Sequence, residues 1–296
     1  MKRSGFVAPP AEASLPVPPP VVSFTPAGPV TPAAAGRESS TPLGPPATRA
    51  EIQASFRDGV SALKRGRLAE AEQLFLFTLK RDPDHVTARI NLALVYDRRG
   101  DRDQALRELR TAARLDGTRP EAYLNLGAIL GEAGRTADAL DYLRRVVELD
   151  HAMIEAHYNL ALLHYRSGQL EEALAAFDRA SQIEPDRFEV LFFRGLVLSK
   201  RGRGHEALAA LERCHAQAPR HAATLYHLGV AYCRADRFDE AIHTLETAAQ
   251  LLPENPRVSY YLGIAYDRAG RAGDGAIAFR RSSELRAQGG DPARLD

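Results

Sequence analysis

The chain has 296 residues, and its 39 Lys and Arg almost balance its 38 Asp and Glu. A near-neutral chain lacks the surplus positive charge from which phosphate-binding proteins gain most of their affinity, so we expect no nucleic-acid partner. Two cysteines exclude a disulfide framework and indicate a reducing compartment, so we predict a cytoplasmic protein.

Residues 1–48 form a proline-rich leader, which holds 12 of the 19 prolines. Because proline fixes φ and lacks a backbone N–H, and because the stretch has no periodicity, we predict a disordered tail. Prolines follow Lys2 and Arg3 too closely for a secretory signal to form, and no apolar run reaches the roughly 20 residues of a membrane span. Spacings such as that of Pro16 and Pro19 leave open docking of the leader in an aromatic groove.

A repeat of 34 residues follows the leader. Small residues recur at this interval, at Gly59, Ala93, Gly127, Ala161, Gly195, Gly229 and Gly263. A bulky column has the same period, at Phe75, Leu109, Leu143, Phe177, Leu211, Leu245 and Phe279. Seven units therefore start near residues 52, 86, 120, 154, 188, 222 and 256, within a repeat domain over residues 49–289 that a short tail, 290–296, follows.

Each unit has the pattern of two helices joined by a tight turn. In the third unit Tyr123, Leu126 and Leu130 share one helical face, and Gly134 ends the helix. A second helix is expected to start near Thr136, with Leu143 on its apolar side. The small residues are expected where the paired helices cross closely. Because one hairpin cannot bury its apolar surface alone, the sequence predicts an all-α, right-handed α-solenoid of stacked hairpins.

The repeat resembles the tetratricopeptide repeat (TPR) family. The resemblance implies that the first helix of every unit lines a concave groove that binds segments of other proteins. It therefore implies a non-enzymatic scaffold or adaptor for protein–protein interaction. Two departures stand out: the family's large aromatic at the fourth position occurs only as Tyr123, and Gly273 and Gly275 weaken the start of the last helix.

Three successive units hold asparagine at the sixth position, which the resemblance places in the groove: Asn91, Asn125 and Asn159. An amide side chain donates and accepts, so it pairs with an extended backbone without reading side chains. In relatives such as the repeat domain of O-GlcNAc transferase, a ladder of this kind holds substrate peptide. Asparagine is also the family's common residue here, so ordinary consensus is the alternative explanation.

Two further columns are candidates for partner contact. Apolar anchors are expected at the fifth position, at Tyr158, Phe192, Tyr226 and Tyr260, with the tyrosine hydroxyls exposed; the alternative is that these rings pack against the next unit. Cations occupy the thirteenth position, at Arg98, Arg166, Lys200 and Arg234. They either bind acidic partner segments or complement helix dipoles at helix ends.

No enzymatic motif is present: the sequence has no Walker A string, dinucleotide fingerprint, GxSxG or HExxH. We therefore predict no catalytic residues and no cofactor. His157 and His164 lie seven residues apart on one helical face, where core filling is favoured over metal binding, and Cys214 is expected to be a buried thiol.

Two alternative functions remain. One is a substrate-recognition subunit of a separately encoded enzyme, such as a glycosyltransferase, and the other is RNA binding. Oligomeric state is not predicted.

Overall fold

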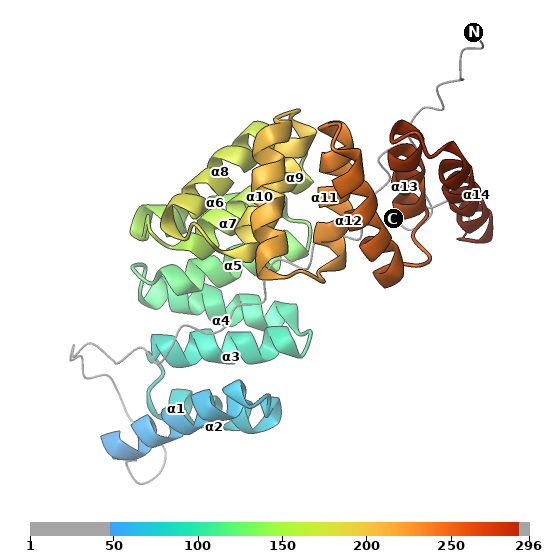
Figure 1. Cartoon of the computed structure of the whole chain (residues 1–296). Helices are drawn as coiled ribbons and strands as arrows, with labels where there is room; N and C mark the ends of the chain where they lie inside the picture. Colours follow the sequence, from blue (N-terminus) through green and yellow to red (C-terminus); the bar gives the residue numbers. More distant parts are fainter. Residues whose placement is uncertain (1–47, 290–296) are drawn as a thin grey trace. The chain divides into compact units, whose positions relative to one another are not determined.

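The computed structural model describes residues 48–289, and these residues form fourteen α-helices and no strand (Figure 1). The prediction of an all-α protein is confirmed. The predicted disordered leader, apart from Thr48, and the short tail over 290–296 lie outside the described residues.

The helices alternate regularly in length, with about thirteen or fourteen residues in all but the first and last. Their bounds are α1 (Arg49–Lys64), α2 (Leu68–Arg81), α3 (Val86–Arg98), α4 (Arg102–Leu115), α5 (Pro120–Glu132), α6 (Thr136–Leu149), α7 (Ile154–Arg166), α8 (Leu170–Ile183), α9 (Phe188–Lys200), α10 (Gly204–Gln217), α11 (Ala222–Arg234), α12 (Phe238–Leu251), α13 (Pro256–Arg268) and α14 (Ala272–Gly289). We refer to the odd-numbered helices as first helices and to the even-numbered ones as second helices.

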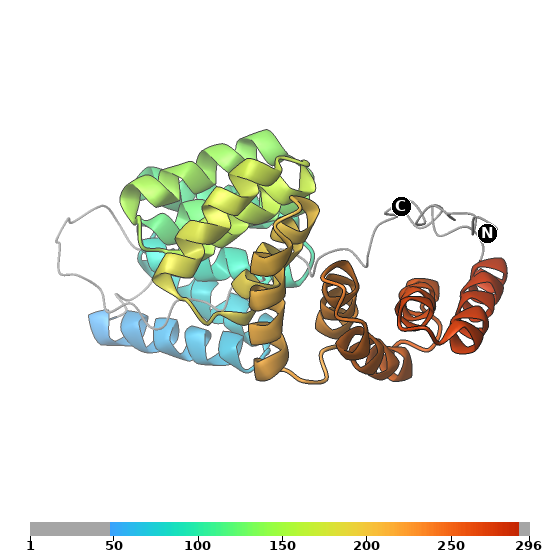
Figure 2. The same cartoon turned by 45° about the horizontal axis from the view of Figure 1, so that its top comes forward.

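The described residues divide into two compact units, and the boundary falls inside α7, between Leu163 and His164. In the N-terminal unit, residues 48–163, three hairpins pair α1 with α2, α3 with α4 and α5 with α6. In the C-terminal unit, residues 164–289, the hairpins pair α9 with α10, α11 with α12 and α13 with α14 (Figures 1 and 2). Within each unit, a second helix also packs against the first helix that follows it.

Local sequence signals set the ends of the helices. Thr48 and Glu51 form a capping box at the start of α1: the Thr48 hydroxyl accepts from the Glu51 N–H at 3.3 Å, and the Glu51 carboxylate accepts from the Thr48 N–H at 2.7 Å. Pro120 and Pro256 stand at the first positions of α5 and α13, where a missing N–H costs nothing. The capping box pairs backbone donors that a helix start leaves free, and each proline removes one such donor.

The turn inside each hairpin uses one residue with positive φ. Gly134, between α5 and α6, has a φ of 76°, and glycine holds the corresponding place in five other turns. In the turn between α11 and α12 the residue is Asp236, with a φ of 57°. Aspartate is among the few residues that enter this region at a modest cost, so the turn keeps its shape without glycine.

The small column lies against the bulky column inside the same hairpin. A Cβ atom on Gly127 of α5 would lie 2.6 Å from Leu143 Cγ of α6, and one on Gly229 of α11 would lie 2.5 Å from Leu245 Cγ of α12. Both distances are far below van der Waals contact. Small residues therefore recur every 34 residues because the two helices of each hairpin cross too closely for a larger side chain.

The first helices α3, α5, α9 and α11 are more buried than the second helices that pair with them. Leu124 through Gly131 are all buried in α5, whereas α6 buries only Ala139, Leu143 and Val146. First helices also touch each other in order, α1 with α3 and α3 with α5, and α9 with α11 and α11 with α13. This burial explains why α5 is apolar on almost every side. Across the described part of the chain, no helix combines the length and apolarity needed to cross a bilayer.

Candidate functional site

The first helices carry all the residues that the sequence nominated for partner contact. The asparagine column belongs to the N-terminal unit, on α3, α5 and α7. Phe192, Tyr226 and Tyr260 belong to the C-terminal unit, on α9, α11 and α13. Tyr158 lies beside Asn159 on α7. The candidate site therefore consists of two sets of residues, one in each unit.

The three asparagines are buried but have free hydrogen-bonding groups. Asn91 is 7% exposed, Asn125 5% and Asn159 1%. None of the three side chains forms a hydrogen bond to another described residue, and both polar atoms of Asn159 are inaccessible. A buried polar group without a partner costs roughly 1–3 kcal/mol. The column therefore holds amide groups whose hydrogen-bonding capacity the described residues leave unused.

The fifth-position rings are packed rather than free. Tyr158 is 1% exposed, and Phe192, Tyr226 and Tyr260 are each less than a tenth exposed. The hydroxyl oxygen of Tyr158 is buried, so the expectation of an exposed hydroxyl there is wrong: the ring lies wholly within the buried first-helix layer. Burial, the main cause, raises the pKa of the Tyr226 hydroxyl to about 12.

The thirteenth-position cations reach back toward the preceding first helix. Arg98 of α3 donates to the carbonyl oxygen of Leu63, in the last turn of α1, at 3.2 Å. Arg234 of α11 donates to the hydroxyl of Ser199, in the last turn of α9, at 2.7 Å. The Lys200 ammonium lies 4.8 Å from the ring centroid of Tyr165. Part of this column therefore stabilises the helix ends of its neighbours.

A group centred on His227 was not singled out by the sequence. His227 is partly buried on α11, with its ring centroid 4.9 Å from that of Tyr226 and 5.8 Å from that of Phe192. Its pKa falls to about 3, first because of burial and then because of the positive charges of Arg234, Arg257 and Lys200. Arg257 occupies the second position of its repeat. The sequence signal for this group was therefore a cation one helical turn before two tyrosines, Tyr260 and Tyr261.

The residues considered for metal binding and thiol chemistry have structural contacts. His157 is buried, and its Nε2 lies 2.9 Å from the carbonyl oxygen of His151. Cys214 is buried beneath the carbonyl oxygen of Phe188, and burial raises the pKa of its thiol to about 12, which makes it a poor nucleophile. Over residues 48–289 no group of three or more His, Cys, Asp or Glu is arranged to hold a metal ion.

Family models match most of the repeat region. Two models described as tetratricopeptide repeat match residues 62–130, 131–191 and 228–292, which together make up about two thirds of the chain. A model of subunit 3 of the anaphase-promoting complex, or cyclosome, matches residues 168–248. No curated protein matches the chain.

Solved structures of repeat proteins share the fold. The pilF protein of Pseudomonas aeruginosa is 19% identical with a TM-score of 0.66, over 71% of this chain and 95% of that one. MamA of Desulfovibrio magneticus RS-1 is 26% identical with a TM-score of 0.54, over 57% of this chain and 96% of that one. YrrB, described as a TPR protein with an unusual peptide-binding site, is 22% identical with a TM-score of 0.55, over 62% of this chain and 95% of that one.

The 34-residue period, the hairpins in which a small residue faces a bulky one, and the matching family models all lead to one assignment. The chain belongs to the tetratricopeptide repeat family.

Proposed function

We propose that the protein is a non-enzymatic scaffold that binds an extended segment of a partner protein through Asn91, Asn125 and Asn159. The observation that carries this proposal is that all three amide side chains lack hydrogen-bond partners among the described residues. An amide can accept from a backbone N–H and donate to a backbone carbonyl, so three amides spaced one repeat apart suit an extended chain. The peptide-binding site reported for YrrB is in keeping with such a role.

Burial makes these groups more valuable for binding than exposed amides. Hydrogen bonds formed in a site with little water gain strength from the low local dielectric. Asn159 carries this cost in the free protein, because both of its polar atoms are buried without a partner among the described residues. A ligand that pairs this amide relieves the cost on binding, which favours the bound state.

The experiment selects ligands from a display library of short random peptides on the full-length chain. Affinities of the selected peptides are then measured for the wild type and for an Asn91→Ala/Asn125→Ala/Asn159→Ala variant. Because each hydrogen bond contributes about 1 kcal/mol, we expect the affinity to fall by roughly 100-fold. Circular dichroism checks that helicity is retained.

The matched control replaces exposed amides on second helices, as Gln73→Ala/Gln182→Ala. Both side chains are exposed, on α2 and α8, away from the asparagine column. The control is expected to bind the selected peptides within about twofold of the wild type. Failure to select any peptide, or equal affinity in the asparagine variant and the wild type, overturns the proposal.

A further inference from the structure

Four large apolar side chains are exposed among the described residues, and two of them are neighbours in the chain. Leu76 and Phe77 of α2 are 40% and 39% exposed, whereas Leu115 of α4 and Ile277 of α14 stand alone. The buried side chains of α2 lie at other positions, so neither Leu76 nor Phe77 belongs to the core. We refer to these two residues as the α2 patch.

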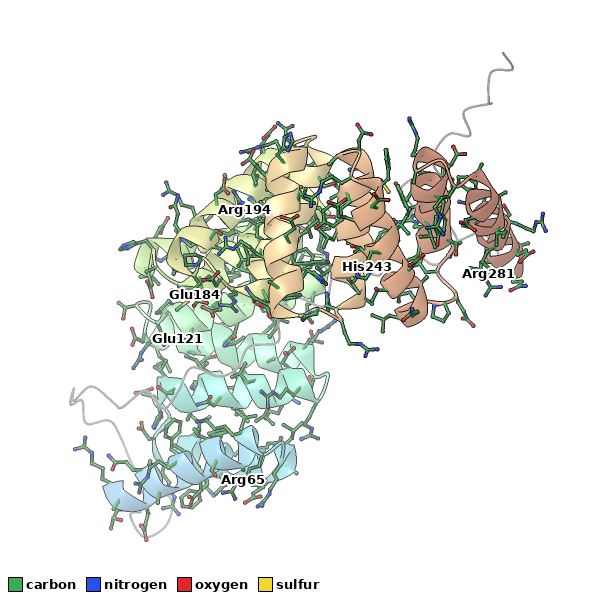
Figure 3. All side chains as sticks on the ribbon, in the orientation of Figure 1. Arg65, Glu121, Glu184, Arg194, His243 and Arg281 are labelled. Atoms are coloured by element: carbon green, nitrogen blue, oxygen red, sulfur yellow. The ribbon has the colours of Figure 1, made fainter. Side chains whose placement is uncertain are left out.

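The α2 patch occurs in one repeat only. At the repeat position of Leu76 the other six second helices hold charged residues, which are Arg110, Arg144, Asp178, Glu212, Glu246 and Arg280. At the position of Phe77 they hold polar or charged residues, which are Thr111, Arg145, Arg179, Arg213, Thr247 and Arg281. Arg281 of α14 is an exposed example (Figure 3). The patch is therefore not a requirement of the repeat, and neighbouring exposed apolar side chains of this kind indicate an interaction surface.

The leader joins the repeat domain at the end of the first hairpin where the α2 patch lies. Residues 1–47 precede Thr48, the N-cap of α1. The Ser55 hydroxyl, two turns into α1, donates to the carbonyl oxygen of Leu74 at 2.9 Å. The two helices run in opposite directions around a three-residue turn (Figure 1). The start of α1 therefore lies beside the part of α2 that follows Leu74, and this part carries the patch.

One segment of the leader has the composition to cover an apolar surface. Residues 15–24 read LPVPPPVVSF and hold five apolar side chains besides four prolines. No residue between Glu12 and Arg37 is charged, so docking of this segment buries no charge. Because prolines fix φ, the segment loses less conformational entropy on docking than a proline-free one. Proline-rich segments also pack on aromatic rings, and Phe77 provides one.

The chain between this segment and α1 is long enough for the contact. Phe24 precedes Thr48 by 24 residues, and an extended chain of this length spans at most about 80 Å. The helix α2, with 14 residues, is only about 21 Å long. Because segment and patch belong to one chain, their effective concentration is on the order of millimolar, which favours docking even where the contact is small.

We propose that residues 15–24 of the leader dock on the α2 patch of the same chain. The contact covers Leu76 and Phe77 and makes this side of α2 an interaction surface for the chain's own N-terminal segment. The inference goes beyond the proposed function, because the patch lies on a second helix and contains none of the three asparagines.

The test places the photoreactive amino acid p-benzoylphenylalanine at position 77 of the full-length chain and identifies the crosslinked peptides by mass spectrometry. The control carries it at position 111, the equivalent position of the next hairpin. We expect crosslinks from position 77 to residues 15–24 of the same chain, with a yield at least about fivefold above that from position 111. Dilution of the sample is expected to leave this yield unchanged, because the contact is intramolecular.

Two leader variants separate docking from mere proximity. Val21→Ser/Phe24→Ser is expected to lower the yield from position 77 at least about fivefold, because it removes two apolar groups from the segment. The matched control Phe6→Ser/Val7→Ser removes the same residue types outside the segment and is expected to stay within about twofold. On the helix, Leu76→Arg introduces the residue of the next repeat and is expected to lower the yield about threefold. The leader variants leave the repeat domain unchanged, so they decide the matter even if the helix variant disturbs α2.

Three results overturn the inference. The first is that crosslinks to the leader are no more abundant from position 77 than from position 111. The second is a predominance of covalent dimers, which assigns the patch to a second copy of the chain. The third is an equal yield from the Val21→Ser/Phe24→Ser variant and its control, which shows that another part of the leader lies near α2. The proposed function fails separately, on the peptides selected for the asparagine column.

Discussion

The two units place different chemistry at the same position of the repeat. The sixth position holds Asn91, Asn125 and Asn159 in the N-terminal unit, and Phe193, His227 and Tyr261 in the C-terminal unit. The amides have no hydrogen-bond partner among the described residues, whereas the rings pack: Phe193 stacks on Phe177 at 6.2 Å with an angle of 3° between their planes.

This difference shows that the hairpin backbone does not decide what the repeat can bind. A small residue facing a bulky apolar one between the helices of each hairpin holds the fold in both units, and this pairing leaves the sixth position free to vary. Where that position is an amide, the unit has unused hydrogen-bonding capacity. Where it is a ring, the side chain packs against neighbouring aromatic rings, as Phe193 does on Phe177 and His227 on Tyr226.

The largest expected effect tests whether both units depend equally on close helix crossing. Gly127→Val and Gly229→Val place atoms within 2.6 Å and 2.5 Å of the leucine on the facing helix, so each variant is expected to lose about 3 kcal/mol of unfolding free energy. Urea unfolding followed by circular dichroism measures the loss. Gly204→Ala, which faces open space, is the control and is expected to change stability by less than about 0.5 kcal/mol. A loss below about 1 kcal/mol in either valine variant contradicts the close crossing.

The second prediction concerns only the C-terminal unit and uses the pKa of His227. The folded protein holds this pKa near 3, below the ordinary value of 6.5, so the unfolded state binds the proton first as pH falls. The stability that the neutral histidine contributes is present above about pH 6.5 and is lost progressively toward pH 3. Relative to a His227→Phe variant, the wild type is therefore expected to lose about 2 kcal/mol between about pH 7.5 and pH 5.

The measurement is urea unfolding of both proteins at the two pH values. The variant serves as the control, because the carboxylates of the rest of the chain titrate alike in both proteins. If the difference in unfolding free energy between wild type and variant is the same at both pH values, His227 is not held neutral by its surroundings.

A third prediction concerns the N-terminal unit, and the expected change in unfolding free energy is smaller. Asn159→Leu replaces a fully buried, unpaired amide by an apolar group of similar shape, so it is expected to raise the unfolding free energy by about 1 kcal/mol while weakening the selected peptides. Thermal and urea unfolding measure the gain. Asn91→Leu is the comparison: this residue is 7% exposed, so a smaller gain is expected. A loss of stability in Asn159→Leu shows that the amide has a partner in the folded protein.

The smallest expected effect is a difference in coupling free energy between two surface ion pairs. Arg194 and Asp178 in the C-terminal unit lie 2.6 Å apart with side chains 23% and 40% exposed, whereas Arg144 and Asp141 in the N-terminal unit lie 3.2 Å apart and are more than half exposed. Double-mutant cycles are expected to give a coupling of about 1 kcal/mol for the first pair and about 0.3 kcal/mol for the second. Equal couplings at low salt contradict the role assigned to burial.

The repeat architecture was predictable because one physical constraint recurs along the chain. Each hairpin needs a small residue opposite a bulky one, so Gly127 and Leu143 have counterparts in nearly every unit, and the period can be read without a structure. Helices α3, α5 and α7 start at residues 86, 120 and 154, as the period indicates. The division of the chain inside α7 has no such signal, because the period continues unchanged through residues 163 and 164.

The candidate site was less predictable, because its properties depend on contacts between units of the repeat. The residue type of Asn159 is visible in the sequence, but whether its amide has a partner depends on what surrounds it. The burial of the Tyr158 hydroxyl depends on its neighbours in the same way. Arg257 acts on His227 because α13 packs beside α11, and a column-by-column comparison of the repeats does not show this convergence.

The contact of α9, α11 and α13 in order has a consequence for mechanical coupling within the C-terminal unit. A ligand that contacts all three helices would link three successive hairpins, each of which otherwise depends on its immediate neighbours. Occupancy would then raise resistance to unfolding in proportion to the logarithm of ligand concentration. A repeat array of this kind would become more rigid when its partner is bound.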